Sequence, residues 1–65
     1  MTELKFNQWR VSHNLSQAAT AKVLGLSWST VQRYDTGKAP VPGPVAAICR
    51  AIDRHPDVID LLQAD

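Results

Sequence analysis

Apolar side chains recur every three or four positions in two short runs within residues 15–37, and each run stops at a glycine. In the first run, small apolar residues follow Ser16, whose hydroxyl suits the N-cap of a helix. This run predicts a helix of about nine residues that begins at Gln17. Gly25 is expected to end it, because glycine adopts the left-handed conformation of a helix C-cap at little cost.

The second run predicts another helix over residues 28–36, with Ser27 as its N-cap and Gly37 as its stop. Val31 and Tyr34 lie three positions apart, so both side chains can face inward. No other apolar residue widens this inner stripe. Most of the surface of the helix is therefore left free for a partner.

Three flanking segments are also expected to be helical and to supply the rest of the core. The first covers residues 3–13 after Thr2 as N-cap, and Asn14 ends it because asparagine tolerates the left-handed conformation. The fourth helix of the chain has Pro44 at its first position, and the last starts near Pro56. The side chains expected to face the core from these helices and from the central turn are those of Leu4, Phe6, Trp9, Leu26, Val45, Ile48, Cys49 and Ile52.

The two central helices resemble the helix-turn-helix of the phage-repressor and Cro family of transcriptional regulators, the XRE type. The motif covers approximately residues 16–37, and the residues that carry the resemblance are Ser16, Gln17, Ala21, Gly25, Ser27, Val31, Gly37 and Lys38. The matching positions outside the motif are Phe6, Trp9 and Arg10 in the first helix and residues 42–52 and 56–62 in the fourth and fifth. The resemblance implies an all-α fold, a compact five-helix lambda-repressor-like DNA-binding domain with a central helix-turn-helix.

The length of the chain points to one small domain over residues 1–65 that either folds marginally alone or gains stability by pairing. At 65 residues it can bury only about 60% of the surface that its unfolded form exposes. The last helix is more apolar than so short a helix needs for its own packing. We therefore expect a homodimer whose interface is formed by Val58, Ile59, Leu61 and Leu62.

Composition narrows the possible chemistry. The single cysteine, Cys49, excludes an internal disulfide and a four-cysteine zinc site, and its place on an apolar stripe predicts a reduced, buried thiol. The chain has no His-Glu-x-x-His motif and no phosphate-binding glycine loop, and no plausible base lies beside Cys49 in the sequence. We expect neither an enzyme nor a cofactor.

The ends of the chain and its apolar runs indicate where the protein acts. No apolar run approaches the ~18 residues of a membrane span, and the N-terminal segment is not a secretory signal. We therefore expect a cytoplasmic protein with no membrane partner, associated with the nucleoid when it is bound to DNA.

The formal net charge of +1 hides a polarised distribution. Residues 1–50 hold six basic and two acidic side chains, whereas residues 51–65 hold one basic and four acidic ones. The basic part can approach phosphates, and the acidic part is expected to avoid them or to meet a protein partner. The alternative is that a short chain shows such asymmetry by chance.

In a helix-turn-helix, the leading end of the second helix enters the major groove, so base contacts are expected from Trp28, Ser29, Gln32 and Arg33. Arg33 can donate two hydrogen bonds to guanine, and its alternatives are a phosphate contact or an ion pair with a neighbouring acid. Trp28 has no hydrogen-bond acceptor. It could lay its ring on a thymine methyl group, or fold back against the preceding helix.

Contacts to the DNA backbone are expected from Gln17, Thr30, Thr36 and Lys38. The loop that follows the second helix carries only Lys38 as a basic residue, whereas members of the family often have several. The resemblance also places Arg10 beside Asp35. We expect a partly buried ion pair that fixes the orientation of the helix, the alternative being two separately solvated charges.

These features predict a sequence-specific DNA-binding regulator, a dimeric repressor or autorepressor of a small operon of the phage or mobile-element type. Its partner would be double-stranded DNA with an inverted repeat whose half-sites lie about one helical turn apart. The alternative is a protein-interaction module that has lost DNA binding and docks through Trp28 and the apolar C-terminus. The weakly basic loop favours this alternative, and the exposed Ser29, Gln32 and Arg33 count against it.

Overall fold

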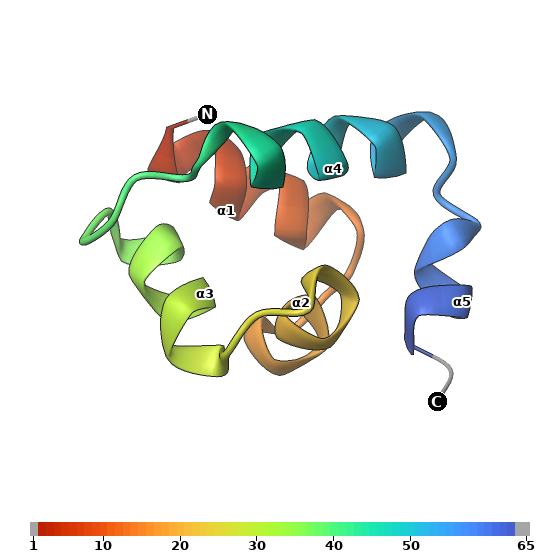
Figure 1. Cartoon of the computed structure of the whole chain (residues 1–65), viewed down its shortest axis with the longest axis horizontal. Helices are drawn as coiled ribbons and strands as arrows, with labels where there is room; N and C mark the ends of the chain where they lie inside the picture. Colours follow the sequence, from red (N-terminus) through yellow and green to blue (C-terminus); the bar gives the residue numbers. More distant parts are fainter. Residues whose placement is uncertain (1, 64–65) are drawn as a thin grey trace.

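The computed structural model describes residues 2–63, and every element of regular secondary structure in this range is a helix (Figure 1). The helices are α1 (Glu3–Ser12), α2 (Gln17–Leu24), α3 (Trp28–Thr36), α4 (Gly43–Arg54) and α5 (Val58–Gln63). The predicted all-α, five-helix architecture is confirmed.

The first three helices begin at side-chain caps, which explains why local sequence predicts them well. In each, a hydroxyl oxygen accepts a hydrogen bond from the backbone N–H three residues later: Thr2 from Lys5, Ser16 from Ala19 and Ser27 from Thr30. The residues that follow these helices adopt positive φ at Asn14 (57°), Gly25 (69°) and Gly37 (78°). The predicted stops at these three positions are therefore confirmed.

The starts of the last two helices differ from the sequence prediction. Helix α4 begins at Gly43, so Pro44 occupies its second position, and Pro42 is the N-cap without a side-chain hydrogen bond. Helix α5 begins at Val58 rather than near Pro56, because the preceding residues form separate turns in which Val58 N–H donates to His55 O. A proline suits a first helical turn, but here the chain uses it in a turn instead.

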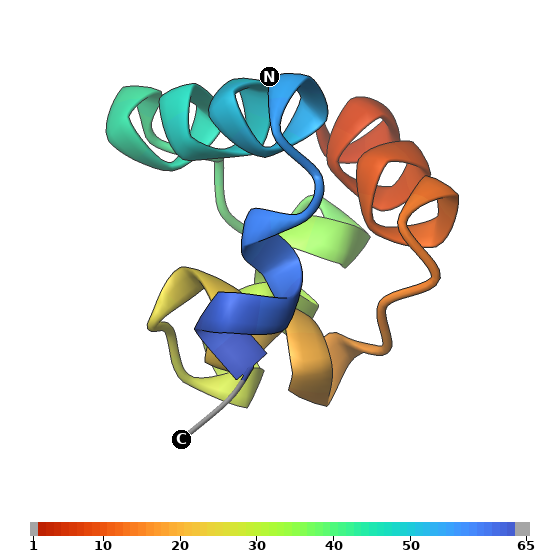
Figure 2. The same ribbon diagram turned by 90° about the vertical axis from the view of Figure 1, so that its right-hand side faces the viewer.

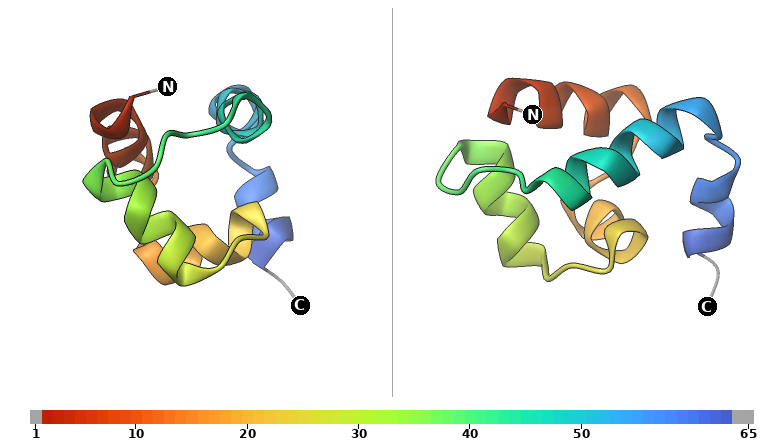
Figure 3. Two further views of the ribbon diagram at one scale, coloured as in Figure 1. Left: turned by 60° about the vertical axis from the view of Figure 1, so that its left-hand side comes forward. Right: turned by 45° about the horizontal axis from the view of Figure 1, so that its top comes forward.

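The helices enclose one core within a body of 29 × 21 × 20 Å. Helices α1 and α4 lie side by side along one long side of the molecule, and α2 and α3 lie on the other (Figures 1 and 3). Helix α5 turns back at the end of α4 and contacts α2 (Figure 2). Helix α3 and helix α5 therefore lie at opposite ends of the longest axis.

The core is built around Phe6, whose ring meets the ring of Tyr34 edge-on at a centroid distance of 5.4 Å. The Trp9 indole N–H donates to the Cys49 carbonyl oxygen over 3.1 Å, which ties α1 to α4. The buried apolar residues are Phe6, Trp9, Leu15, Ala21, Val23, Val31, Tyr34, Val41, Ala46, Cys49 and Ile52.

The residues of α4 that face the core differ slightly from the predicted set. Ile48 is 44% exposed, and Ala46 is buried in its place, together with Cys49 and Ile52. Val45 and Leu26 are partly buried and pack against the core, as expected. The side chain of Leu4 lies outside the described part of the structure.

The predicted buried, free thiol of Cys49 is confirmed. Burial raises the pKa of this thiol to about 11, and the carboxylate of Asp53 adds to the rise. The thiol is therefore protonated near neutral pH and is a poor nucleophile.

None of the helices in residues 2–63 is long and apolar enough to cross a membrane. Within the same range, no group of three or more His, Cys, Asp or Glu residues is arranged to hold a metal ion.

Candidate nucleic-acid interface

The outer face of α3 is free of intramolecular packing because Val31 and Tyr34 anchor its inner face in the core, as the sequence predicts. Ser29, Gln32 and Arg33 all lie on the exposed side. Gly37 ends the helix in the left-handed conformation, and Lys38 follows with its side chain exposed.

Five of these outer residues line one hollow of about 310 Å³ on the surface: Ser29, Gln32, Arg33, Thr36 and Lys38. The structure thus brings together three of the predicted base-contact residues and two of the predicted backbone-contact residues. Arg33 and Lys38 place two positive charges at this hollow, and neither has an ion-pair partner within residues 2–63. An ion pair with a neighbouring acid, one of the alternatives for Arg33, is thus not formed there.

Trp28 stands at the start of α3, outside the lining of this hollow. It is 51% exposed and does not belong to the residues that pack against the core. An indole has one N–H donor and no acceptor, and the rest of its surface is apolar. Trp28 therefore offers mainly an apolar face to whatever approaches the leading end of α3.

Thr30 and Thr36, both predicted to contact phosphate, already use their hydroxyl groups within α3. Thr30 Oγ1 lies 2.8 Å from Ser27 Oγ, in the cluster that caps the helix. Thr36 Oγ1 donates to the Gln32 carbonyl oxygen over 2.9 Å. The one hydrogen of the Thr36 hydroxyl is therefore committed, whereas either hydroxyl can be the donor between Ser27 and Thr30.

A buried ionic group lies behind the exposed face. Arg10 Nε lies 2.9 Å from Asp35 Oδ2, and the side chain of Asp35 is 4% exposed. The Nε–H bond does not point at this oxygen, so the contact is an ion pair without a directed hydrogen bond. Arg10 Nη1 also donates to the Leu15 carbonyl oxygen over 2.8 Å. Arg10 and Asp35 are therefore paired instead of separately solvated.

Gln17, the first residue of α2, occupies a place that sequence reasoning missed. Its side-chain Nε2 donates to Asp35 Oδ2 over 2.9 Å, so the amide belongs to the same buried group. The sequence contained one hint: an acid paired with a single arginine has lone pairs left for another donor. The two residues are too far apart along the chain for local patterns to identify Gln17 as that donor.

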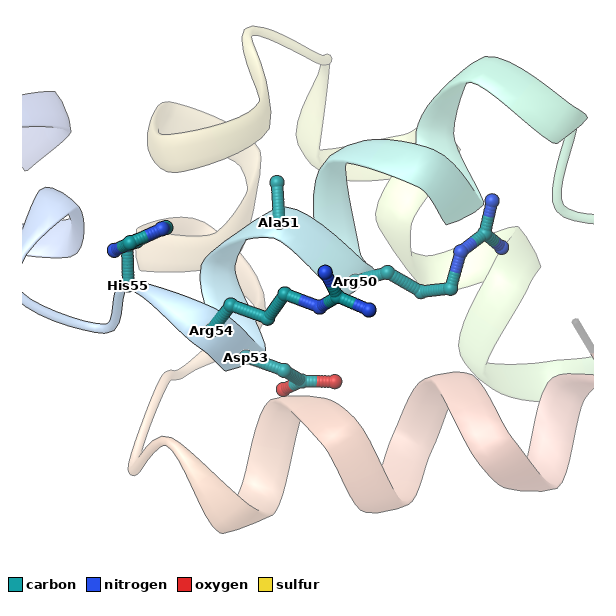
Figure 4. A pocket seen from close by; sticks show the side chains of 5 residues that line it. All are labelled: Arg50, Ala51, Asp53, Arg54 and His55. Carbon is teal, nitrogen blue, oxygen red and sulfur yellow. The ribbon is translucent and has the colours of Figure 1, made fainter.

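A second, larger hollow of about 490 Å³ lies at the end of α4, away from α3 (Figure 4). Its lining residues are Arg50, Ala51, Asp53, Arg54 and His55, none of which the sequence analysis selected as a site residue. In Figure 4 the Asp53 carboxylate points toward α1, where His13 Nε2 lies 2.8 Å from Asp53 Oδ1. This carboxylate therefore links the two helices.

The four apolar residues predicted to form a dimer interface fall into two pairs. Val58 and Ile59 are partly buried and pack against the core of their own chain, because α5 folds back onto α2. Leu61 is 73% exposed and Leu62 is 40% exposed. Of the four, only Leu61 is largely open to a partner, and Leu62 is partly so.

Together, these observations define a small all-helical domain in which a short helix, anchored from behind, presents an exposed polar and basic face after a tight turn. Residues 5–62 match a family model described as a helix-turn-helix domain. The chain belongs to this helix-turn-helix domain family, which indicates a DNA-binding regulator.

This match does not distinguish the phage-repressor and Cro type from other helix-turn-helix domains. Searches of curated proteins and of solved structures gave no match.

Proposed function

We propose that this protein is a sequence-specific DNA-binding transcriptional regulator that inserts α3 into the major groove. The observation that carries the proposal is the hollow on the outer face of α3, which combines hydrogen-bonding side chains with two unpaired positive charges. The helix-turn-helix match over residues 5–62 supports the same reading. Arg33 would then read a guanine, with Ser29 and Gln32 on neighbouring base edges.

The backbone of the DNA would be held on both sides of α3. Lys38 supplies a charge just after the helix, and Gln17 stands at the start of α2, where the positive end of the helix dipole favours a phosphate. Thr30 can add a hydroxyl contact, whereas Thr36 would first have to give up its hydrogen bond to the Gln32 carbonyl oxygen. With few basic side chains in the interface, we expect a shallow dependence of affinity on salt.

We further propose that the protein acts as a dimeric repressor or autorepressor on an inverted repeat, in the manner of phage and mobile-element regulators. Leu61 and Leu62 are exposed at the end of the molecule opposite to α3. Because α3 and α5 lie at opposite ends of the 29 Å axis (Figure 1), end-to-end pairing through α5 would place the two α3 helices up to twice that length apart. The two chains would therefore have to meet at an angle for their α3 helices to reach half-sites ~34 Å apart.

The test is selection of bound sequences from a random duplex pool with the purified protein at moderate salt. Enrichment of a short inverted repeat supports a dimeric, sequence-reading regulator, and enrichment of a single half-site supports sequence reading by a monomer. A double variant, Gln32→Ala with Arg33→Ala, is the control and should lose the enrichment while it keeps the fold. If the wild-type protein enriches no sequence, the proposal is wrong.

The second candidate is a protein-interaction module on the same fold. The exposed indole of Trp28 and the loop over residues 39–43, which has no basic residue, favour it. Such a module would bind duplex DNA weakly and without sequence preference, and Trp28→Ala would leave that weak binding unchanged. Under the first proposal, Trp28→Ala changes the selected sequence.

A further inference from the structure

The carboxylate of Asp35 joins three helices at one point. It comes from the last turn of α3. A single oxygen, Oδ2, lies 2.9 Å from Arg10 Nε of α1, with which it forms an ion pair, and accepts a hydrogen bond of 2.9 Å from the Gln17 amide of α2. Since a carboxylate only accepts hydrogen bonds, the nitrogen of the Gln17 side chain, and not its oxygen, must face Asp35. This contact fixes the orientation of the amide.

We propose that Asp35 is a positioning residue for Gln17: it holds one N–H of the Gln17 amide so that the other N–H is presented to a DNA phosphate. This inference rests on the proposed function. A primary amide has two N–H groups, and the carboxylate occupies one of them. Gln17 is only partly buried, which leaves the second N–H able to reach a partner outside the core.

Arg10 makes the arrangement electrostatically possible. A buried carboxylate without a counter-charge would repel a phosphate that shared the same amide, and the guanidinium beside Asp35 offsets that charge. The same guanidinium donates to the Leu15 carbonyl oxygen, two residues before Gln17. Arg10 therefore holds both the carboxylate and the segment that leads into α2.

The length and neutrality of Gln17 fit this role. Asparagine is one methylene shorter and would not span the distance to Asp35, although it keeps an amide at the same helix position. Glutamate would place a second carboxylate against the first and offer no donor to the phosphate. Gln17→Asn thus keeps an amide at this position but removes its hydrogen bond to Asp35. The Arg10–Asp35 pair stays intact.

The first experiment is a double-mutant cycle on affinity for a short mixed-sequence duplex at low salt, since a phosphate contact does not depend on sequence. Gln17→Ala should weaken binding about tenfold in the wild-type background, as expected for loss of a hydrogen bond to a charged group. In the Asp35→Ala background, which has no acceptor at this position, the same change should have little effect. Gln17→Asn should bind as weakly as Gln17→Ala, and Arg54→Ala, far from α3, should bind like wild type.

The second experiment is a direct measurement on the Gln17 side-chain amide by NMR, with thermal unfolding to verify that each variant folds. In the free wild-type protein, one amide proton should exchange slowly because it is bonded to Asp35, and the other should shift when duplex is added. If Asp35→Ala does not fold, Gln17→Asn provides the comparison, because it should lose the slow proton.

The outcomes separate this inference from the proposed function. Wild-type binding with additive effects of Gln17→Ala and Asp35→Ala, or full affinity in Gln17→Asn, overturns the positioning role alone. A wild-type protein that binds no duplex overturns both. Non-additive losses together with the slow amide proton support the positioning role.

Discussion

The helix-turn-helix segment, residues 16–37, and the terminal helix α5 differ in how completely the chain fixes them. Both helices of the first segment have a serine cap and a glycine stop, and the buried Asp35 links the segment to α1. Helix α5 has six residues, none of which is fully buried, and two leucines remain exposed. The outer face of α3, proposed to bind DNA, therefore has its conformation fixed in the free protein. Helix α5, in contrast, leaves apolar side chains exposed that a partner could cover.

This difference has an energetic meaning. A surface held in place by its own chain loses little conformational entropy on binding, so more of the contact energy appears as affinity. A short helix with few buried contacts opens at low free energy. Variants that act on the two regions separately test the distinction.

The largest effect is expected from Phe6→Ala, which removes the ring shared by α1 and α3. Truncation of a fully buried phenylalanine costs about 3–5 kcal/mol, which is close to the whole stability of many small domains. The variant should be largely unfolded in a urea titration followed by circular dichroism. Val11→Ala, at an exposed position of the same helix, is the control. A wild-type midpoint for Phe6→Ala would contradict the description of the core.

The next effect concerns DNA affinity. Arg33→Ala should cost about 1–3 kcal/mol on the selected sequence and relax the preference at one base pair of each half-site. The measurement is a binding titration with the selected duplex and with single-base variants of it. Arg50→Ala changes an exposed arginine outside the α3 face and should bind like wild type. An equal loss for all sequences would show that Arg33 contacts phosphate.

A smaller effect is expected from the cap of α3. Ser27→Ala removes the acceptor for the Thr30 N–H and should lower the free energy of unfolding by about 1 kcal/mol. Ser27→Asp keeps an acceptor at the N-cap and should retain most of that stability. Chemical unfolding of both variants measures the difference. Equal losses in the two variants would mean that the hydroxyl acts through something other than capping.

The smallest effect on the stability of a single chain is expected from Leu61→Asp, because this side chain is largely exposed. Its free energy of unfolding should change by no more than about 0.5 kcal/mol in dilute protein. Sedimentation equilibrium should nevertheless show that the wild-type chain associates and that the variant does not. Ile48→Asp, at another exposed apolar position, is the control for a general effect of charge. Association that survives in Leu61→Asp would exclude α5 as the dimer interface.

The sequence predicts the helix-turn-helix well because the signals there are local. A serine before each helix and a glycine after it act on neighbouring backbone groups, so they need no knowledge of the rest of the fold. The inward positions of Val31 and Tyr34 follow from helical spacing alone. The Arg10–Asp35 pair was reached through the family resemblance instead.

The errors have a tertiary origin. Ile48 lies on an apolar stripe of α4, but which side of a helix is buried depends on how the helix packs, and here Ala46 is buried while Ile48 is exposed. Residues 56–57 carry helix-start signals, but they form turns that bring α5 back onto α2. The bond between Gln17 and Asp35 joins residues 18 positions apart. No local pattern could have predicted it.

The two tryptophans give the molecule a pair of built-in fluorescent probes with separate environments. Trp9 is buried and hydrogen-bonded in the core, so its emission should change only when the chain unfolds. Trp28 is exposed at the leading end of α3, so its emission should respond to any partner that covers that end. In the Trp28→Phe variant, Trp9 is the remaining tryptophan, so the emission reports on the core. Unfolding and binding can therefore be followed separately in one unlabelled protein.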